Sequence, residues 1–114
     1  MRITKRRVGA TLVFDLAGHL DTNTAAEFFS VVEFSLPPFE PRVLFNLEKI
    51  AFLDSTGLSA MMQSMKRCRE RGGHLGLYNL PRPVQAIFEL TRLDRAFYIF
   101  SSEAEALEKL GKSE

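Results

Sequence analysis

The chain has 114 residues, of which 46% are hydrophobic and 25% charged, with a formal net charge of +1. These values predict one soluble globular domain over residues 1–114, and they exclude a disordered or fibrous chain. The small net charge gives no reason to expect nucleic acid as a direct partner, and no run approaches the roughly 18 to 20 apolar residues needed for membrane insertion. The first residues do not begin a signal peptide, and a single cysteine, Cys68, excludes an internal disulfide framework or a Cys-rich metal site. A reducing, cytoplasmic location is therefore expected.

The first third of the chain predicts two strands and a helix. Residues 2–7 favour a short edge strand, and residues 10–17 favour a second strand bounded by Gly9 and Gly18. In this second strand the apolar residues Leu12, Phe14 and Leu16 alternate along the chain with Thr11, Val13 and Asp15. A helix is predicted from Asp21 or Thr22 up to the prolines at 37 and 38, which cannot continue it. Its apolar stripe comprises Ala25, Phe28, Phe29, Val32 and Leu36.

From residue 43 onward, predicted strands and helices alternate. Residues 43–47 are apolar nearly throughout, which is typical of a strand covered on both faces, and a strand end is expected at Leu53. A helix follows from about Ser55 to Arg71, stopped by the glycines at 72 and 73. Its apolar side comprises Leu58, Met61, Met62, Met65 and Cys68. This side is expected to be core, and the alternative is that Met61 or Met62 is exposed near the start of the helix as a partner contact.

The remaining elements continue the alternation. A strand is predicted over residues 74–79, a third helix after Pro81, and a short strand over residues 96–100. The apolar face of the third helix is expected to carry Val84, Ile87, Phe88 and Thr91. A capping box at residues 102–105 opens a terminal helix that Gly111 closes. This order predicts an α/β fold with a mixed sheet of about five strands, mostly parallel, and about four helices.

The sequence carries none of the usual enzyme motifs. It has no phosphate-binding G-x-x-x-x-G-K-[ST], no G-x-G-x-x-G and no G-x-S-x-G nucleophile turn. His19 and His74 lie at predicted strand boundaries and are interpreted as ordinary surface or edge histidines. Cys68 lies on an apolar helix face, where thiols are usually inert. The basic clusters at residues 5–7 and 66–71 are interpreted as solvated ends. We therefore expect a protein that is not an enzyme and has no cofactor or metal.

The segment Asp54-Ser55-Thr56-Gly57 is the candidate site. It joins a predicted strand to a predicted helix, at the edge of the sheet where open α/β folds usually bind ligands. Ser55 would lie near the N-cap, beside the free amide groups of the first turn. Gly57 costs about 1 kcal/mol relative to alanine inside a helix, which suggests that something approaches closely there. The simpler interpretation is a helix cap formed by Asp54 or Ser55.

With its surroundings, this segment resembles the central signature of STAS domains, which occur in anti-sigma factor antagonists and sulfate transporters. The similar stretches are residues 43–47 and 50–58, residues 18–21 with Thr24 and Ala25, residues 72–75 and 77–79, and the third-helix positions 84, 88–91 and 93. The resemblance extends from about residue 8 to residue 110. It implies the STAS fold for the whole chain.

The resemblance also implies a function. In bacterial anti-sigma factor antagonists, the serine after the aspartate is phosphorylated by the anti-sigma factor, which is a serine kinase, and a serine phosphatase reverses the modification. By position, Ser55 is the phosphoacceptor and Thr56 the less favoured one. The implied partner-binding residues are Asp21, Thr24, Asp54, Ser55, Thr56, Gly57 and Leu58.

Two residues depart from the family pattern, and two other functions stay open. His19 stands where an acidic or small polar residue is frequent, and Asn46 stands where many members have aspartate. A monomeric, stand-alone regulator is expected. The alternatives are a scaffold or adaptor subunit of a membrane transport or other regulatory complex, and a module that senses a nucleotide or anion at the helix N-terminus.

Overall fold

The computed structural model describes residues 1–111 as one five-stranded sheet with four α-helices. The strand order is β1-β2-β3-β4-β5, with β1 antiparallel to β2 and every other neighbouring pair parallel. This confirms the predicted mixed sheet and its alternation of strands and helices. The elements are, in chain order, β1 (Arg2–Val8), β2 (Thr11–Leu20), α1 (Ala25–Ser35), β3 (Arg42–Leu53), α2 (Ser55–Glu70), β4 (His74–Tyr78), α3 (Arg82–Leu90), a 3-10 turn (Leu93–Arg95), β5 (Tyr98–Phe100) and α4 (Glu103–Gly111).

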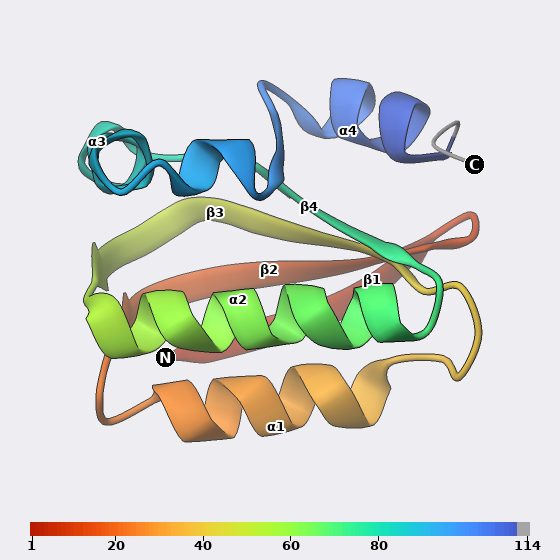
Figure 1. Ribbon diagram of the computed structural model, residues 1–114, viewed down its shortest axis with the longest axis horizontal. Helices are drawn as coiled ribbons and strands as arrows, with labels where there is room; N and C mark the ends of the chain where they lie inside the picture. Colours follow the sequence, from red (N-terminus) through yellow and green to blue (C-terminus); the bar gives the residue numbers. More distant parts are fainter. Residues whose placement is uncertain (112–114) are drawn as a thin grey trace.

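The two faces of the sheet carry separate cores. Helices α1 and α2 lie next to each other along one face, where the larger core includes the fully buried rings of Phe14, Phe28 and Phe45 (Figure 1). Helix α4 packs on the other face, with Ala106 and Leu110 against a smaller core around residues 13, 44 and 78. Each fully buried phenylalanine contributes about 1.5–3 kcal/mol relative to an exposed one. The larger core therefore fixes how α2 is placed on the sheet.

Several predicted boundaries differ from the structure. Helix α1 begins at Ala25 rather than at Asp21 or Thr22, because residues 21–24 form a turn in which the Thr24 amide donates to the Asp21 carbonyl at 3.1 Å. Gly18 does not end β2 but lies inside it, at a register shift and with φ of +108°. Strand β5 begins at Tyr98 instead of residue 96, because the 3-10 turn precedes it.

Burial also differs from the predicted pattern. Thr11 and Val13 are buried although they alternate with the inward-facing leucines. Val13 is covered because α4 packs on the second face of the sheet. Met62 and Ile87 are only partly buried, and Thr91 is exposed. Met61, Met65 and Cys68 are buried in the core, as predicted.

The basic clusters are not simply solvated ends. On α2, the Arg67 side chain donates to the Glu33 carboxylate of α1 at 2.6 Å, and Arg71, directly after α2, donates to the Leu36 carbonyl at 3.2 Å. On β1, Arg6 forms ion pairs with the Asp15 carboxylate at 2.7 Å and with Glu103 of α4. These pairs join elements up to 97 residues apart in the sequence, so local charge patterns could not reveal them.

Candidate functional site

The turn between β3 and α2 lies at the carboxyl edge of the parallel strands, where β3 ends at Leu53 and the 16-residue helix α2 begins at Ser55 (Figure 1). Asp54 is the N-cap, and its carboxylate Oδ1 accepts the Gly57 amide at 2.9 Å. Of the two predicted caps, the structure therefore selects Asp54, and Ser55 is the first helical residue. The Ser55 hydroxyl is consequently not needed to cap the start of the helix.

The loop after β2 holds the second oxygen of this carboxylate. Asp54 Oδ2 accepts the Thr22 amide at 3.1 Å and the Thr22 hydroxyl at 3.3 Å. These hydrogen bonds, the Gly57 amide foremost, lower the pKa of Asp54 below its ordinary value, so the side chain is ionised at neutral pH. Thr22 was not predicted as a site residue, because nothing in the sequence shows that a loop 32 positions earlier meets this turn.

The two hydroxyls of the turn are in different environments. Both Ser55 and Thr56 are exposed. The Thr56 hydroxyl lies 3.4 Å from the Thr22 hydroxyl, whereas that of Ser55 has no hydrogen-bond partner within residues 1–111. Ser55 thus presents a free hydroxyl at the positive end of the α2 dipole.

Gly57 is required by the fold itself. A Cβ at this position would lie 2.2 Å from the Leu20 carbonyl oxygen and 2.8 Å from the Leu20 carbonyl carbon. The close approach inferred from the sequence is therefore that of β2 and not of a ligand. Leu58, with 8% of its surface exposed, is part of the core, so Gly57 and Leu58 support the turn from beneath.

Asp21 and Thr24 organise the neighbouring loop. Asp21 Oδ1 accepts the Asn23 amide at 2.9 Å, and the Thr24 hydroxyl donates to the His19 carbonyl at 2.8 Å. Both residues are half-buried, and their contacts fix the loop from which Thr22 reaches Asp54. Of the predicted site residues, Gly57 and Leu58 thus bond directly to Asp54, whereas Asp21 and Thr24 reach it only through the loop that carries Thr22.

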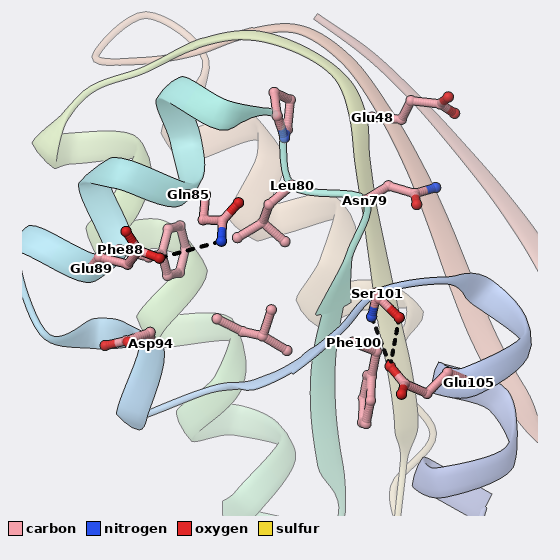
Figure 2. Close-up of a pocket in the computed structure, with 12 residues that line it drawn as sticks. Glu48, Asn79, Leu80, Gln85, Phe88, Glu89, Asp94, Phe100, Ser101 and Glu105 are labelled. Carbon is pink, nitrogen blue, oxygen red and sulfur yellow. Dashed lines mark hydrogen bonds between the residues drawn. The ribbon is translucent and has the colours of Figure 1, made fainter.

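A separate cavity of about 920 Å³ lies among α3, β5 and the start of α4. Figure 2 shows Glu89 and Asp94 on one side of it and Glu105 on the other, with the Ser101 amide and hydroxyl bonded to Glu105. Glu48 also contributes to the lining, and none of the described lining residues is cationic. This acidic lining disfavours a phosphate-bearing ligand and contains none of the predicted site residues.

Two other kinds of site are absent from the part of the chain that the structure describes. Residues 1–111 contain no group of three or more histidine, cysteine or acidic side chains placed to hold a metal ion. Over the same residues, no helix has both the length and the apolar character required to span a bilayer.

Comparisons with known proteins agree on one family. The model of the STAS domain family matches residues 2–106. The anti-sigma F factor antagonist of Paenibacillus polymyxa is 23% identical over 100 residues, which cover 87% of this chain and 86% of that protein.

Two solved structures share the fold at low sequence identity. An anti-sigma factor antagonist from Mycobacterium paratuberculosis superposes with a TM-score of 0.82 at 20% identity, covering 96% of this chain and 92% of that one. The Bacillus cell fate determinant SpoIIAA in its phosphorylated form superposes with a TM-score of 0.72 at 19% identity, covering 95% and 98%.

Proposed function

The chain belongs to the STAS domain family, and we propose that it is an anti-sigma factor antagonist in a partner-switching pathway. The unphosphorylated form binds an anti-sigma factor that is also a serine kinase, and this binding releases a sigma factor. Phosphorylation of Ser55 abolishes binding, and a serine phosphatase restores it. The observation that carries the proposal is the exposed Ser55 hydroxyl, which has no hydrogen-bond partner among residues 1–111, at the start of α2 beside an ionised Asp54.

The same geometry supports Ser55 over Thr56 as the phosphoacceptor. The Thr56 hydroxyl faces Thr22, while the Ser55 hydroxyl is open to an incoming kinase. Asp54 already accepts hydrogen bonds from Gly57 and Thr22 on its two oxygens. Its role is therefore to hold the turn in one conformation and to present a negative charge at the surface that a partner covers.

The fold tolerates a phosphate at this position. A phosphoserine adds about −1.5 to −2 charge at neutral pH, and a helix N-terminus stabilises such a charge. The inhibitory effect then arises at the interface, where a partner surface that fits a neutral hydroxyl meets a bulky anion next to Asp54. We expect a large loss of affinity with little change in structure.

This function is regulatory and not catalytic, and it assigns no cofactor to the chain. The anti-sigma F factor antagonist from Paenibacillus polymyxa supports the assignment by similarity along most of both chains. We propose that the protein acts as a cytoplasmic monomer, with the anti-sigma factor kinase and a serine phosphatase as partners, and without direct contact to nucleic acid.

The test uses the recombinant anti-sigma factor kinases of the host, one at a time, with ATP. Mass spectrometry should find the phosphate on Ser55 in the wild type, and no phosphate in Ser55→Ala. Ser59→Ala is the matched control, because Ser59 is an exposed hydroxyl on the same helix, one turn further along. In titration calorimetry Ser55→Asp should lose binding to the kinase, with an unchanged circular dichroism spectrum. Phosphate on another residue, or full binding by Ser55→Asp, would contradict the proposal.

The same variants separate the alternatives. An adaptor of a membrane complex would retain the same subunits with Ser55→Ala and with Ser55→Asp in an affinity capture. A nucleotide sensor would show saturable binding when the purified chain is titrated with ATP or GTP in the absence of kinase.

A further inference from the structure

Strand β3 contains two irregularities just before the phosphoacceptor turn. Strand β4 accompanies β3 only as far as Asn46, and beyond that point β3 continues beside β2. The register of β3 with β2 shifts twice. Asp15 and Ala17 of β2 pair with Asn46 and Lys49 of β3, which are three residues apart instead of two. Gly18 and His19 pair with Ile50 and Phe52, which are two residues apart instead of one. Each shift inserts one extra residue into β3, which is the signature of a β-bulge.

The second bulge turns an aromatic side chain outward. Simple alternation from the buried Ile50 would place Phe52 in the core and Leu53 at the surface. The extra residue at Ala51 reverses this, so Leu53 is 6% exposed while Phe52 is 49% exposed. The bulge thus leaves Phe52, three positions before Ser55, half exposed instead of buried. Bulges near functional sites often re-aim a side chain in this way.

The surroundings of Phe52 form a definite surface. The His19 ring lies against Phe52 with a centroid distance of 5.8 Å and a tilt of 45°. Ala17 pairs with Arg2 on one side and with Lys49 on the other, so these residues share the face of His19 and Phe52. We call Arg2, His19, Lys49 and Phe52 the sheet-face patch.

The sheet-face patch lies on the side of the sheet opposite α1 and α2. Helix α4 covers the other half of that side, around Val13, Leu44 and Tyr78, and lies toward the opposite end of β3 from the start of α2 (Figure 1). Arg2, His19, Lys49 and Phe52 are all exposed. The patch is therefore an aromatic pair flanked by cations, continuous along β3 with the Ser55 turn.

We propose that the sheet-face patch is a second docking surface for the kinase that recognises Ser55. This inference rests on the proposed function, because it assumes that a protein partner covers the turn. Three observations favour that occupant: continuity with the turn, an exposed aromatic pair of the kind that anchors interfaces, and a cationic border that fits an acidic partner surface. The partner places an apolar side chain against Phe52 and His19, and acidic groups near Arg2 and Lys49.

The experiment compares Phe52→Ala with Phe39→Ala. Phe39 is 82% exposed in the loop between α1 and β3, which leads into the start of β3 rather than its carboxyl end. Binding of the unphosphorylated chain to the recombinant anti-sigma factor kinase is measured by calorimetry, and phosphorylation of Ser55 by steady-state kinetics. We expect Phe52→Ala to weaken binding about tenfold or more and to raise KM with little change in kcat, because Phe52 lies outside the reacting turn. Phe39→Ala should match the wild type in both assays.

A charge-reversal variant tests the border of the patch. Lys49→Glu should slow association and reduce its dependence on salt, while the dissociation rate changes less. Unchanged thermal unfolding of Phe52→Ala and Lys49→Glu would show that the effects arise at the surface and not from misfolding.

Each outcome has a separate meaning. If Ser55→Asp abolishes binding but Phe52→Ala binds within twofold of the wild type, the sheet-face patch is not part of the interface while the partner switch stands. If the wild type self-associates in sedimentation and Phe52→Ala removes only that association, the occupant is a second copy of the chain and our inference is wrong. If the wild type binds no anti-sigma factor kinase, the proposed function fails, and the patch proposal fails with it.

Discussion

Replacing Gly57 by alanine should destabilise the protein, although alanine is the better helix former. Gly57 lies in the first turn of α2 with an ordinary helical backbone, so helix propensity alone favours Gly57→Ala by about 1 kcal/mol. The added methyl group, however, would lie 2.2 Å from the Leu20 carbonyl oxygen. Leu20 is fully buried, and the same carbonyl accepts the Asp54 amide at 3.3 Å. Neither β2 nor the start of α2 can move without disturbing that hydrogen bond.

The size of the effect follows from these contacts. Forcing an extra methyl group into a packed site costs about 1–3 kcal/mol, and a weakened backbone hydrogen bond adds about 0.5–1.5 kcal/mol. After the gain of about 1 kcal/mol in propensity, we expect a net loss of about 0.5–3.5 kcal/mol in the free energy of unfolding.

Urea unfolding followed by circular dichroism measures this loss as a lower midpoint at unchanged slope. Ser59→Ala, at an exposed position two residues further along α2, is the control and should be neutral or slightly stabilising. A Gly57→Ala protein as stable as the wild type would refute the argument that β2 fixes the start of α2.

Two further predictions concern groups outside the turn. Arg6→Met should lower the free energy of unfolding by about 1–2 kcal/mol at neutral pH, less than for a fully buried pair because the side chains of Arg6, Asp15 and Glu103 are 38%, 31% and 35% exposed. Hydrogen bonds from Arg6 lower the pKa of both carboxyls, so their stabilisation is present above the ordinary carboxyl range and is lost as the pH falls through the lowered values. The difference between Arg6→Met and wild type should therefore shrink in urea titrations at pH 3, and an equal difference at both pH values would count against this ion pair. Burial raises the pKa of Cys68 to about 12, so a disulfide reagent at pH 8 should react slowly with the native protein and rapidly in denaturant; rapid reaction of the native protein would show that the thiol is accessible.

The element order could be predicted because it depends on local periodicity. The helical spacing of Phe28 and Val32, and the apolar run at residues 43–47, are dictated by which faces are buried. The exposure of Phe52 could not be predicted, since alternation from Ile50 indicates a buried side chain and only the bulge in β3 reverses it. The sequence does not reveal the role of Arg6 for a related reason: its carboxylate partners lie on β2 and α4, 9 and 97 residues away.

The candidate site likewise contains residues that the sequence indicates and one that it does not. Asp54, Ser55 and Gly57 were recognisable because capping residues and a glycine at a strand-to-helix junction carry a local signal. Thr22 carries none, because its loop reaches Asp54 only after β2 and β3 have paired in register through Leu20 and Leu53. A tertiary contact of this kind is set by the sheet and not by the neighbouring sequence.

The contacts around Asp54 also bear on how the proposed phosphorylation of Ser55 would act as a switch. One carboxylate oxygen is held by the first turn of α2 and the other by Thr22, while Leu20 packs against Gly57 from beneath. The turn is therefore fixed before any partner arrives, and binding does not require the turn to become ordered. Because the turn is fixed, it would not rearrange to move a phosphate on Ser55 away from the partner-facing surface. In the proposed switch, the added charge of about −1.5 to −2 would then face the partner, and the affinity for that partner would fall.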